Sequence, residues 1–238
     1  MSNQRRNRIP QILIGQLAVT LMIVIVSVSL IFYSQGWRIN FKNFKIYKTG
    51  LVYLMINPTP EKIYIDNKEY GGKNEFYLNL IPGDYNIRIT KEGYSEWTEN
   101  IKISEEMVSS YKNVLLFSKN PSISTLTDQS KIDYLNSPDN SLAENARKKL
   151  AYNKYEIWTD DKLVTRFSVP IENVAWFPDY EHIVYQQANQ IKVVDKDGFN
   201  ENVLATLSGL NSTKFVIGGQ GKELYFIDNG QYKKAIIQ

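Results

Sequence analysis

The longest apolar stretch lies near the start of the chain, where no charged residue occurs between Ile9 and Trp37. Residues 12–33 are almost unbroken apolar sequence. A helix of this length would measure about 33 Å, which is enough to cross a bilayer core of about 30 Å. A buried helix of a soluble protein usually keeps a polar stripe, and this stretch has none. We therefore expect a transmembrane helix over residues 12–33.

A cleaved signal peptide is the closest alternative for this stretch. The apolar region of such a peptide normally spans about 7–15 residues and is followed by small residues at the cleavage site. This stretch is longer, and its Ser27-Val28-Ser29 lies inside the apolar sequence. An uncleaved signal anchor fits the pattern better.

Apolar and polar residues alternate with a period of two from Gly50 to Phe117, with turn residues between the runs. Val52, Leu54 and Ile56 fall on one face of the first run, as in a half-buried strand. Proline and glycine interrupt the pattern, for example at Pro82-Gly83. About six or seven short strands are expected, which predicts a compact β-sandwich over residues 50–117.

Several motifs in this stretch resemble those of PEGA domains in their identity and order. They are Pro58, Ile63-Tyr64-Ile65-Asp66, Gly72-Lys73, Leu80-Ile81-Pro82-Gly83-Asp84-Tyr85 and Lys91-Glu92-Gly93-Tyr94. Two positions depart from the family pattern: Pro58-Thr59-Pro60-Glu61 stands where Pro-Glu-Gly-Ala is typical, and Asn67 replaces the glycine that usually follows Asp66. The resemblance implies a small β-sandwich of bacterial and archaeal surface proteins, with a binding or spacing role and no catalytic residues.

Residues 118–146 are rich in Ser, Asn, Asp, Thr and Pro, and this composition predicts a linker. Ser141 and Glu144 have the spacing of a capping box, so a short helix is expected to begin at Ser141.

The last part of the chain, residues 147–238, repeats its own pattern at intervals of roughly 35–40 residues, the period of a propeller blade. The clearest repeat covers about residues 171–204 and resembles a WD40-like repeat of the TolB type. Its motifs are Trp176-Phe177-Pro178-Asp179, Ile183-Val184-Tyr185 and Ile191–Gly198. A closed propeller needs at least about four blades, so we expect partial propeller repeats: an open stack of sheets, a pair formed with a second copy, or the repeats of a shortened relative of a longer protein.

The overall prediction is a mainly β protein with an N-terminal transmembrane helix, and its charge is unevenly distributed. The formal net charge is +3, yet residues 1–48 contain seven basic residues and no acidic one. The remaining residues are therefore mildly acidic. A basic patch that could neutralise nucleic-acid phosphates is not expected, so nucleic acid is not a predicted partner.

Residue types limit the chemistry further. The chain has no cysteine, which excludes disulfides, thiolate catalysis and cysteine-ligated metals, and His182 is its one histidine. It has no G-x-S-x-G or phosphate-loop motif. We expect no enzyme activity, no catalytic residue, no metal site and no cofactor.

Flanking charge does not decide the orientation of the helix, because both of its flanks are basic. Residues 1–11 form a short basic tail, and residues 34–49 form a basic juxtamembrane linker. A short tail before a large C-terminal region favours a cytoplasmic N-terminus. The chain would then be a single-pass protein of the cell membrane, with its β domains on the extracytoplasmic side.

Four aromatic residues are candidate ligand or partner contacts: Tyr94, Trp97, Trp158 and Trp176. Such rings pack against sugars and protein partners as well as inside cores. The expected partners are the lipid bilayer, a cell-wall glycan, an S-layer component or another surface protein, and a second copy of the chain through open propeller edges.

The predicted function is a membrane-anchored extracytoplasmic module that binds or spaces components of the cell envelope. The alternative is a membrane sensor or regulator that signals through its short cytoplasmic tail.

Overall fold

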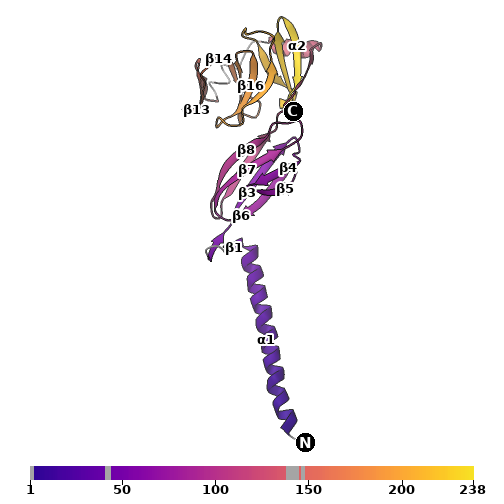
Figure 1. Cartoon of the computed structure of the whole chain (residues 1–238), viewed down its shortest axis with the longest axis vertical. Coiled ribbons are helices and arrows are strands. Elements are labelled where there is room, and N and C mark those ends of the chain that lie inside the picture. Colours follow the sequence, from indigo (N-terminus) through magenta and orange to yellow (C-terminus); the bar gives the residue numbers. More distant parts are fainter. Residues whose placement is uncertain (1–2, 41–43, 138–144, 146–147) are drawn as a thin grey trace. The chain divides into compact units, whose positions relative to one another are not determined.

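The computed structural model describes residues 3–40, 44–137, 145 and 148–238. The described chain is mainly β and begins with a long apolar helix, α1 (Asn3–Ser34) (Figure 1). Within α1, the 22 residues Leu13–Ser34 meet the length and composition criteria of a membrane span, and 0% of the span is buried. The apolar helix predicted for residues 12–33 is therefore confirmed. A signal sequence meets the same criteria of length and composition.

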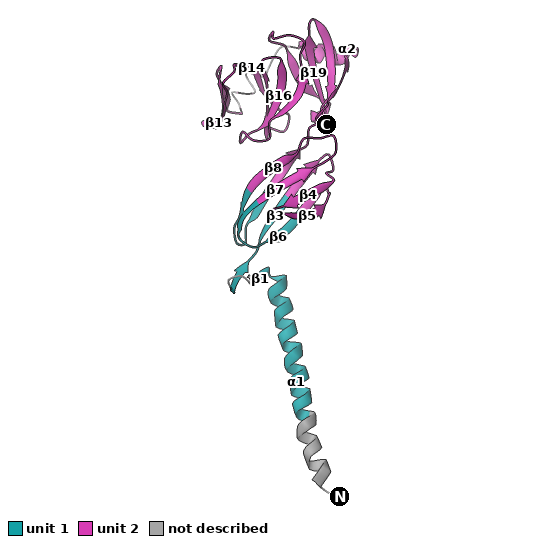
Figure 2. Cartoon of the chain, viewed as in Figure 1, with its two compact units in different colours: residues 1–53, 77–85, 101–110 teal, residues 54–76, 86–100, 111–238 magenta. Residues whose placement is uncertain are grey.

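The chain divides into two compact units, coloured separately in Figure 2. The first unit comprises residues 1–53, 77–85 and 101–110. The second comprises residues 54–76, 86–100 and 111–238. The division runs through the region that resembles a PEGA domain, and it groups the beginning of strand β8 with the C-terminal region.

A short hairpin follows α1, in the segment for which a plain linker (residues 34–49) was predicted. Strands β1 (Trp37–Asn40) and β2 (Lys45–Lys48) pair antiparallel, with Trp37 opposite Lys48. Gly36 adopts φ +83°, a left-handed conformation that glycine takes without strain, between the helix and β1. The strand was not predicted because the basic residues of this segment indicated a linker, although Trp37 and Ile39 alternate with polar residues as in a strand.

The region that resembles a PEGA domain contains two sheets, with strand orders β6-β3-β9 and β5-β4-β7-β8. The strands are β3 (Gly50–Asn57), β4 (Lys62–Ile65), β5 (Lys68–Gly71), β6 (Glu75–Leu80), β7 (Gly83–Thr90), β8 (Trp97–Ile103) and β9 (Val108–Leu115). Val52, Leu54 and Ile56 are buried, which confirms the predicted inner face of β3. Two sheets with alternate residues buried are the pattern of a β-sandwich.

The stretch predicted as a linker, residues 118–146, contains regular structure. Strand β10 (Ser122–Thr125) pairs with β20 near the end of the chain, and helix α2 (Gln129–Asn136) follows it. The Asp128 carboxylate caps α2 by accepting a hydrogen bond of 3.0 Å from the backbone N–H of Ser130. The helix predicted to begin at Ser141 lies outside the described residues.

The C-terminal region contains antiparallel sheets with strand orders β11-β12-β13, β14-β15-β16-β17 and β10-β20-β19-β18. Their strands are β11 (Leu150–Tyr152), β12 (Glu156–Thr159), β13 (Lys162–Arg166), β14 (Ile171–Trp176), β15 (His182–Gln187), β16 (Gln190–Asp195), β17 (Asn202–Thr206), β18 (Phe215–Gly218), β19 (Glu223–Asp228) and β20 (Gln231–Ile236); a short 3-10 turn, η1 (Gly219–Gly221), follows β18. The second sheet is a meander located on the predicted WD40-like repeat of residues 171–204. The sheets of the described chain do not close into a propeller.

Core packing joins the segment after β9 to the C-terminal sheets. Phe117, two residues after β9, belongs to a buried cluster with Phe177, Val184 and Phe226 of the C-terminal sheets. A second buried cluster contains Ile157, Ile183 and Tyr185, among others. The residue that ends the predicted sandwich is therefore a core residue of the region that follows.

Candidate functional site

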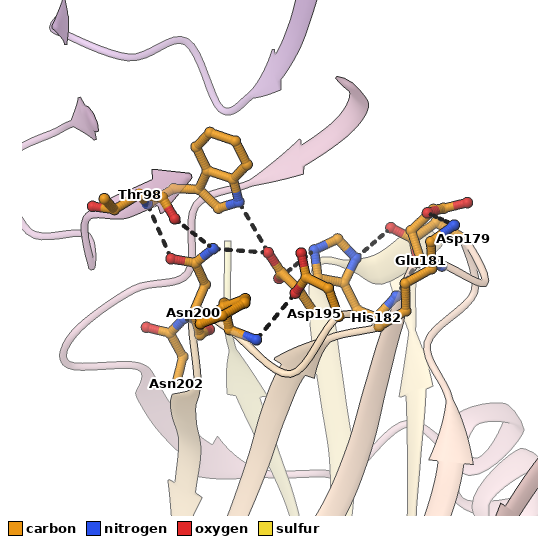
Figure 3. A network of polar contacts seen from close by, with 11 residues as sticks. Thr98, Asp179, Glu181, His182, Asp195, Asn200 and Asn202 are labelled. Carbon is orange, nitrogen blue, oxygen red and sulfur yellow. Dashed lines mark hydrogen bonds and ion pairs between the residues drawn. The ribbon is translucent and has the colours of Figure 1, made fainter. Parts of the chain in front are cut away.

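A network of polar side chains connects the start of β8 to the turn between β16 and β17 (Figure 3). Trp97 is the first residue of β8 and is only 5% exposed. Its indole N–H donates a hydrogen bond of 3.0 Å to Oδ2 of Asp195. The side-chain N–H of Asn200 donates to the same oxygen at 2.9 Å. Asp195 therefore binds two donors that are far apart in the sequence.

The Asn200 amide also pairs with the backbone of β8. Its Oδ1 accepts a hydrogen bond from the Thr98 N–H at 3.0 Å, and its Nδ2 donates to the Thr98 carbonyl at 3.2 Å. This two-way pairing satisfies both main-chain groups of Thr98, as a neighbouring strand would. A side chain from the C-terminal region thus continues the hydrogen bonding of β8.

A tight turn places Asp195 and Asn200 together. Gly198 donates its N–H to the Asp195 carbonyl at 2.8 Å and adopts φ +90°. Asn200 adopts φ +54°, a left-handed conformation that asparagine tolerates better than most residues. The local sequence predicts a turn here, and the turn aims both polar side chains at β8.

His182 lies on the other side of Asp195 and is 2% exposed. Its Nδ1 is 2.7 Å from Oδ2 of Asp179, and its Nε2 is 3.2 Å from Oδ1 of Asp195. The rings of Phe117 and Phe177 pack against it at centroid distances of 5.8 and 5.7 Å. Burial by itself would lower the pKa of His182, but hydrogen bonds and charge from the two carboxylates outweigh it and raise the pKa to about 9. The imidazole is therefore positively charged at neutral pH.

Both ring nitrogens of His182 contact carboxylates, so neither nitrogen is free to act on a ligand. A general base or a metal ligand needs a free ring nitrogen. Asp179 is in turn held by the backbone N–H groups of Glu181 and His182, at 2.9 and 3.2 Å. The arrangement is that of a buried ion-pair network that holds segments together.

Glu99 lies at the edge of this network, next to Asp197 and Asp195. Partial burial and then the two negative charges raise the pKa of Glu99 to about 7. Burial of Tyr111, together with the charges of Glu99 and Asp197, raises the pKa of its hydroxyl group. The Tyr111 ring packs against Trp97 at a centroid distance of 6.0 Å. Glu99 is a group that changes its charge near neutral pH.

A separate cavity of about 480 Å³ lies between β13, the end of β14 and the turn after β16. Its lining residues are Lys148, Thr159, Asp160, Lys162, Leu163, Val164, Trp176, Tyr180, Lys196 and Asp197. Trp176 and Tyr180 meet edge to face at 6.2 Å, and the Lys148 Nζ lies 4.2 Å from the centre of the Tyr180 ring. The buried Trp176 indole N–H has no hydrogen-bond partner among the described residues. The cavity therefore offers aromatic surface and cationic groups, and its volume is in the usual range for small-ligand sites.

The four aromatic residues that were candidate contacts differ in their burial and in their surroundings. Trp97 is buried in the network and is not available to a partner. Trp158 is half-buried and donates its indole N–H to Glu156 at 3.3 Å, and Tyr94 is half-buried beside Lys91. Trp176 lines the cavity. Asp195, Asn200 and His182 were not among the candidate contact residues predicted from the sequence.

Comparisons with known proteins cover different parts of the chain. No curated protein matches it at a significant level. Among solved structures, a DUF3823 family protein from Bacteroides ovatus ATCC 8483 aligns with 80% of this chain and 96% of its own, at 9% identity and a TM-score of 0.20. A score this low supports no argument about fold. A family comparison is more specific: residues 49–115 match the PEGA domain family, close to the predicted boundaries of 50–117.

Proposed function

We propose that this chain is a single-pass membrane protein that holds its PEGA domain and C-terminal β region outside the cytoplasm, where they bind or space components of the cell envelope. The observation that carries the proposal is the apolar surface of α1. The span Leu13–Ser34 contains no charged residue, and nothing in the described chain covers it. A bilayer is the environment in which such a surface is stable.

The match to the PEGA domain supports the location, because the family resemblance implies surface proteins. Aromatic residues at the end of the span support the membrane anchor. Tyr33 and Trp37 stand where α1 ends and β1 begins, and amphipathic rings favour the membrane–water interface. The large β region after the span is then the part that meets the envelope.

The cavity at Trp176 supports a binding role within this function. The half-buried ring of Trp176 lines the cavity, where its accessible part can stack on a sugar ring, while Lys148 and Lys162 can pair with acidic groups of a glycan. We expect Trp176→Ala to weaken binding of a uronic-acid oligosaccharide at least about tenfold, corresponding to about 1.4 kcal/mol, in titration calorimetry of the full chain. Trp158→Ala is the matched control, because Trp158 lies outside the cavity, and equal loss in both variants would contradict the assignment.

The topology is tested with cysteine labelling, because the chain has no cysteine of its own. Leu210 is 76% exposed in the C-terminal region, so Leu210→Cys should react with a membrane-impermeant maleimide on intact cells. Ser2→Cys should react only after the membrane is permeabilised. The reverse result, or a shortened chain in the soluble fraction, would contradict the proposal.

A further inference from the structure

The β1–β2 hairpin is attached directly to the end of α1 by backbone hydrogen bonds. The N–H of Gly36 donates to the Tyr33 carbonyl at 3.2 Å, and the N–H of Thr49 donates to the Gly36 carbonyl at 2.9 Å. The first bond closes the end of the helix, and the second closes the base of the hairpin. The hairpin therefore begins where the apolar span ends.

Side chains strengthen this attachment. The Arg38 guanidinium lies 3.7 Å from the centre of the Tyr33 ring and donates to the carbonyls of Tyr33 and Trp37 at 2.9 and 2.8 Å. Phe32 and Trp37 meet at a centroid distance of 6.1 Å. Aromatic rings and an arginine at the end of a span are the groups expected at a membrane–water interface.

The hairpin exposes three large apolar side chains. Ile39 and Ile46 are direct cross-strand partners and therefore lie on the same face. They are 52% and 60% exposed, and Phe44, directly before β2, is 81% exposed. A two-stranded hairpin is marginally stable by itself in water, so an apolar face of this kind needs an apolar environment.

Basic residues accompany this face. Arg38 alternates with Trp37 and Ile39, so it points to the opposite side of the hairpin, as does Lys45 relative to Ile46. Lys48 lies on the same side as Ile39 and Ile46. There Glu106 neutralises it in an ion pair, and the Trp37 ring centre is 5.2 Å away. The sequence has no acidic residue before Glu61. One apolar side and one cationic side match the two parts of an anionic lipid surface.

Distance also favours lipid as the partner of the hairpin. Trp37 is three residues beyond Ser34, so it lies at most about 11 Å further along the chain. The headgroup region is roughly 5–8 Å thick on each side of the hydrocarbon core. A hairpin fixed to the end of the span therefore starts within or next to the headgroups of the leaflet where the span ends.

We propose that the β1–β2 hairpin is a lipid-binding element that places Ile39, Phe44 and Ile46 in the outer leaflet and Arg38 and Lys45 among anionic headgroups. The proposal rests on the membrane insertion of α1 in the proposed function. It adds a second membrane contact, which would restrict the rotation of the chain about its anchor and hold the following residues at the membrane surface.

The test measures the depth of single labelled cysteines in the full chain, reconstituted in phosphatidylcholine nanodiscs with or without phosphatidylglycerol. Phe44→Cys reports the hairpin, Val24→Cys reports the span, and Leu210→Cys is an exposed apolar control. Each cysteine carries a polarity-sensitive fluorophore, and doxyl-labelled lipids quench those that contact the bilayer. We expect quenching at positions 24 and 44 and none at position 210.

Anionic lipid should increase the quenching at position 44, because each cation near an anionic surface favours the bound state roughly fivefold. Adding Ile46→Asp to Phe44→Cys should reduce it. If position 44 resembles position 210 while position 24 is quenched, the hairpin proposal is overturned and the anchor stands. If position 24 is not quenched, the anchor itself is overturned. Equal quenching in both lipid mixtures overturns the role of the cations.

Discussion

The chain uses two different kinds of contact to join its parts, one at the end of α1 and one at the start of β8. At the first, backbone bonds and the Arg38–Tyr33 contact lie near the surface, and apolar side chains remain exposed. At the second, Trp97 and His182 are buried and bind Asp195 from two sides. The first arrangement has room for another partner, whereas the second is already filled by its own residues.

The difference predicts how each junction responds to the loss of one member. An exposed cation–π or ion pair contributes about 0.5–1 kcal/mol, and its members return to water when it breaks. Removing one member of a buried ion network leaves a charge without a partner, which costs about 3–5 kcal/mol. Substitutions at the two junctions should therefore differ several-fold in their effect on the free energy of unfolding.

The largest effect is expected for His182→Asn. The imidazolium is bound to Asp179 and Asp195, so its removal leaves two half-buried carboxylates without their charge partner, next to the position of the Phe117 and Phe177 rings. We expect the full chain in detergent to lose about 3 kcal/mol of unfolding free energy at pH 6. Tryptophan fluorescence during denaturant unfolding measures the change.

The same variant has a pH signature. The folded pKa of His182 is about 9, above its ordinary value of 6.5. A raised pKa means that the stabilisation is fully present below about pH 6.5 and is lost as pH rises through about 9. The difference between wild type and His182→Asn should therefore shrink between pH 6.5 and 9.5. A difference that stays constant over this range would show that the charge of His182 does not stabilise the network.

A smaller effect of opposite sign is expected for Glu99→Gln. The folded pKa of Glu99 is about 7, above its ordinary value of 4.5, so its stabilisation is present below about pH 4.5 and is lost as pH rises through 7. Glutamine resembles the neutral carboxyl group. At pH 8 we expect the variant to be more stable by about 1 kcal/mol, less than the pKa change implies because Glu99 is partly solvated.

Thermal unfolding of the Glu99→Gln variant between pH 5 and 8.5 checks this expectation. Glu96→Gln is the matched control, since Glu96 is exposed and its carboxylate is 3.7 Å from Arg88, outside the network. A loss of stability at pH 8 in Glu99→Gln would mean that the network needs the negative charge of Glu99.

The comparison of junctions also shows which features sequence patterns can predict. Continuous or alternating apolar residues predicted α1 and the buried face of β3 (Val52, Leu54 and Ile56) because burial repeats with the period of the element. The PEGA motifs likewise depend on local turns. Such features can be predicted because the pattern lies within one continuous segment of the sequence.

The features that the sequence did not predict depend on partners that are far apart. Trp97 and Asp195 are 98 positions apart, and β10 pairs with β20 across a similar distance. Each of these segments has a sufficient local explanation, as a strand, a turn or a linker, so no local pattern indicates the pairing. The β1–β2 hairpin was missed for another reason, since its cations resemble those of an ordinary membrane flank.

The smallest effect is expected for Arg38→Gln at the end of α1. Its guanidinium contacts the Tyr33 ring and two carbonyls, and water can replace these contacts because the junction is near the surface. We expect a change in global unfolding free energy of about 0.5 kcal/mol in detergent, similar to that of Lys222→Gln, an exposed cation elsewhere. Amide hydrogen exchange should nevertheless become faster at Gly36 and Thr49 in Arg38→Gln alone, because their backbone bonds close this junction. A global loss as large as that of His182→Asn would mean that the two junctions do not differ, since the contacts at the end of α1 would then be as tightly coupled as the buried network.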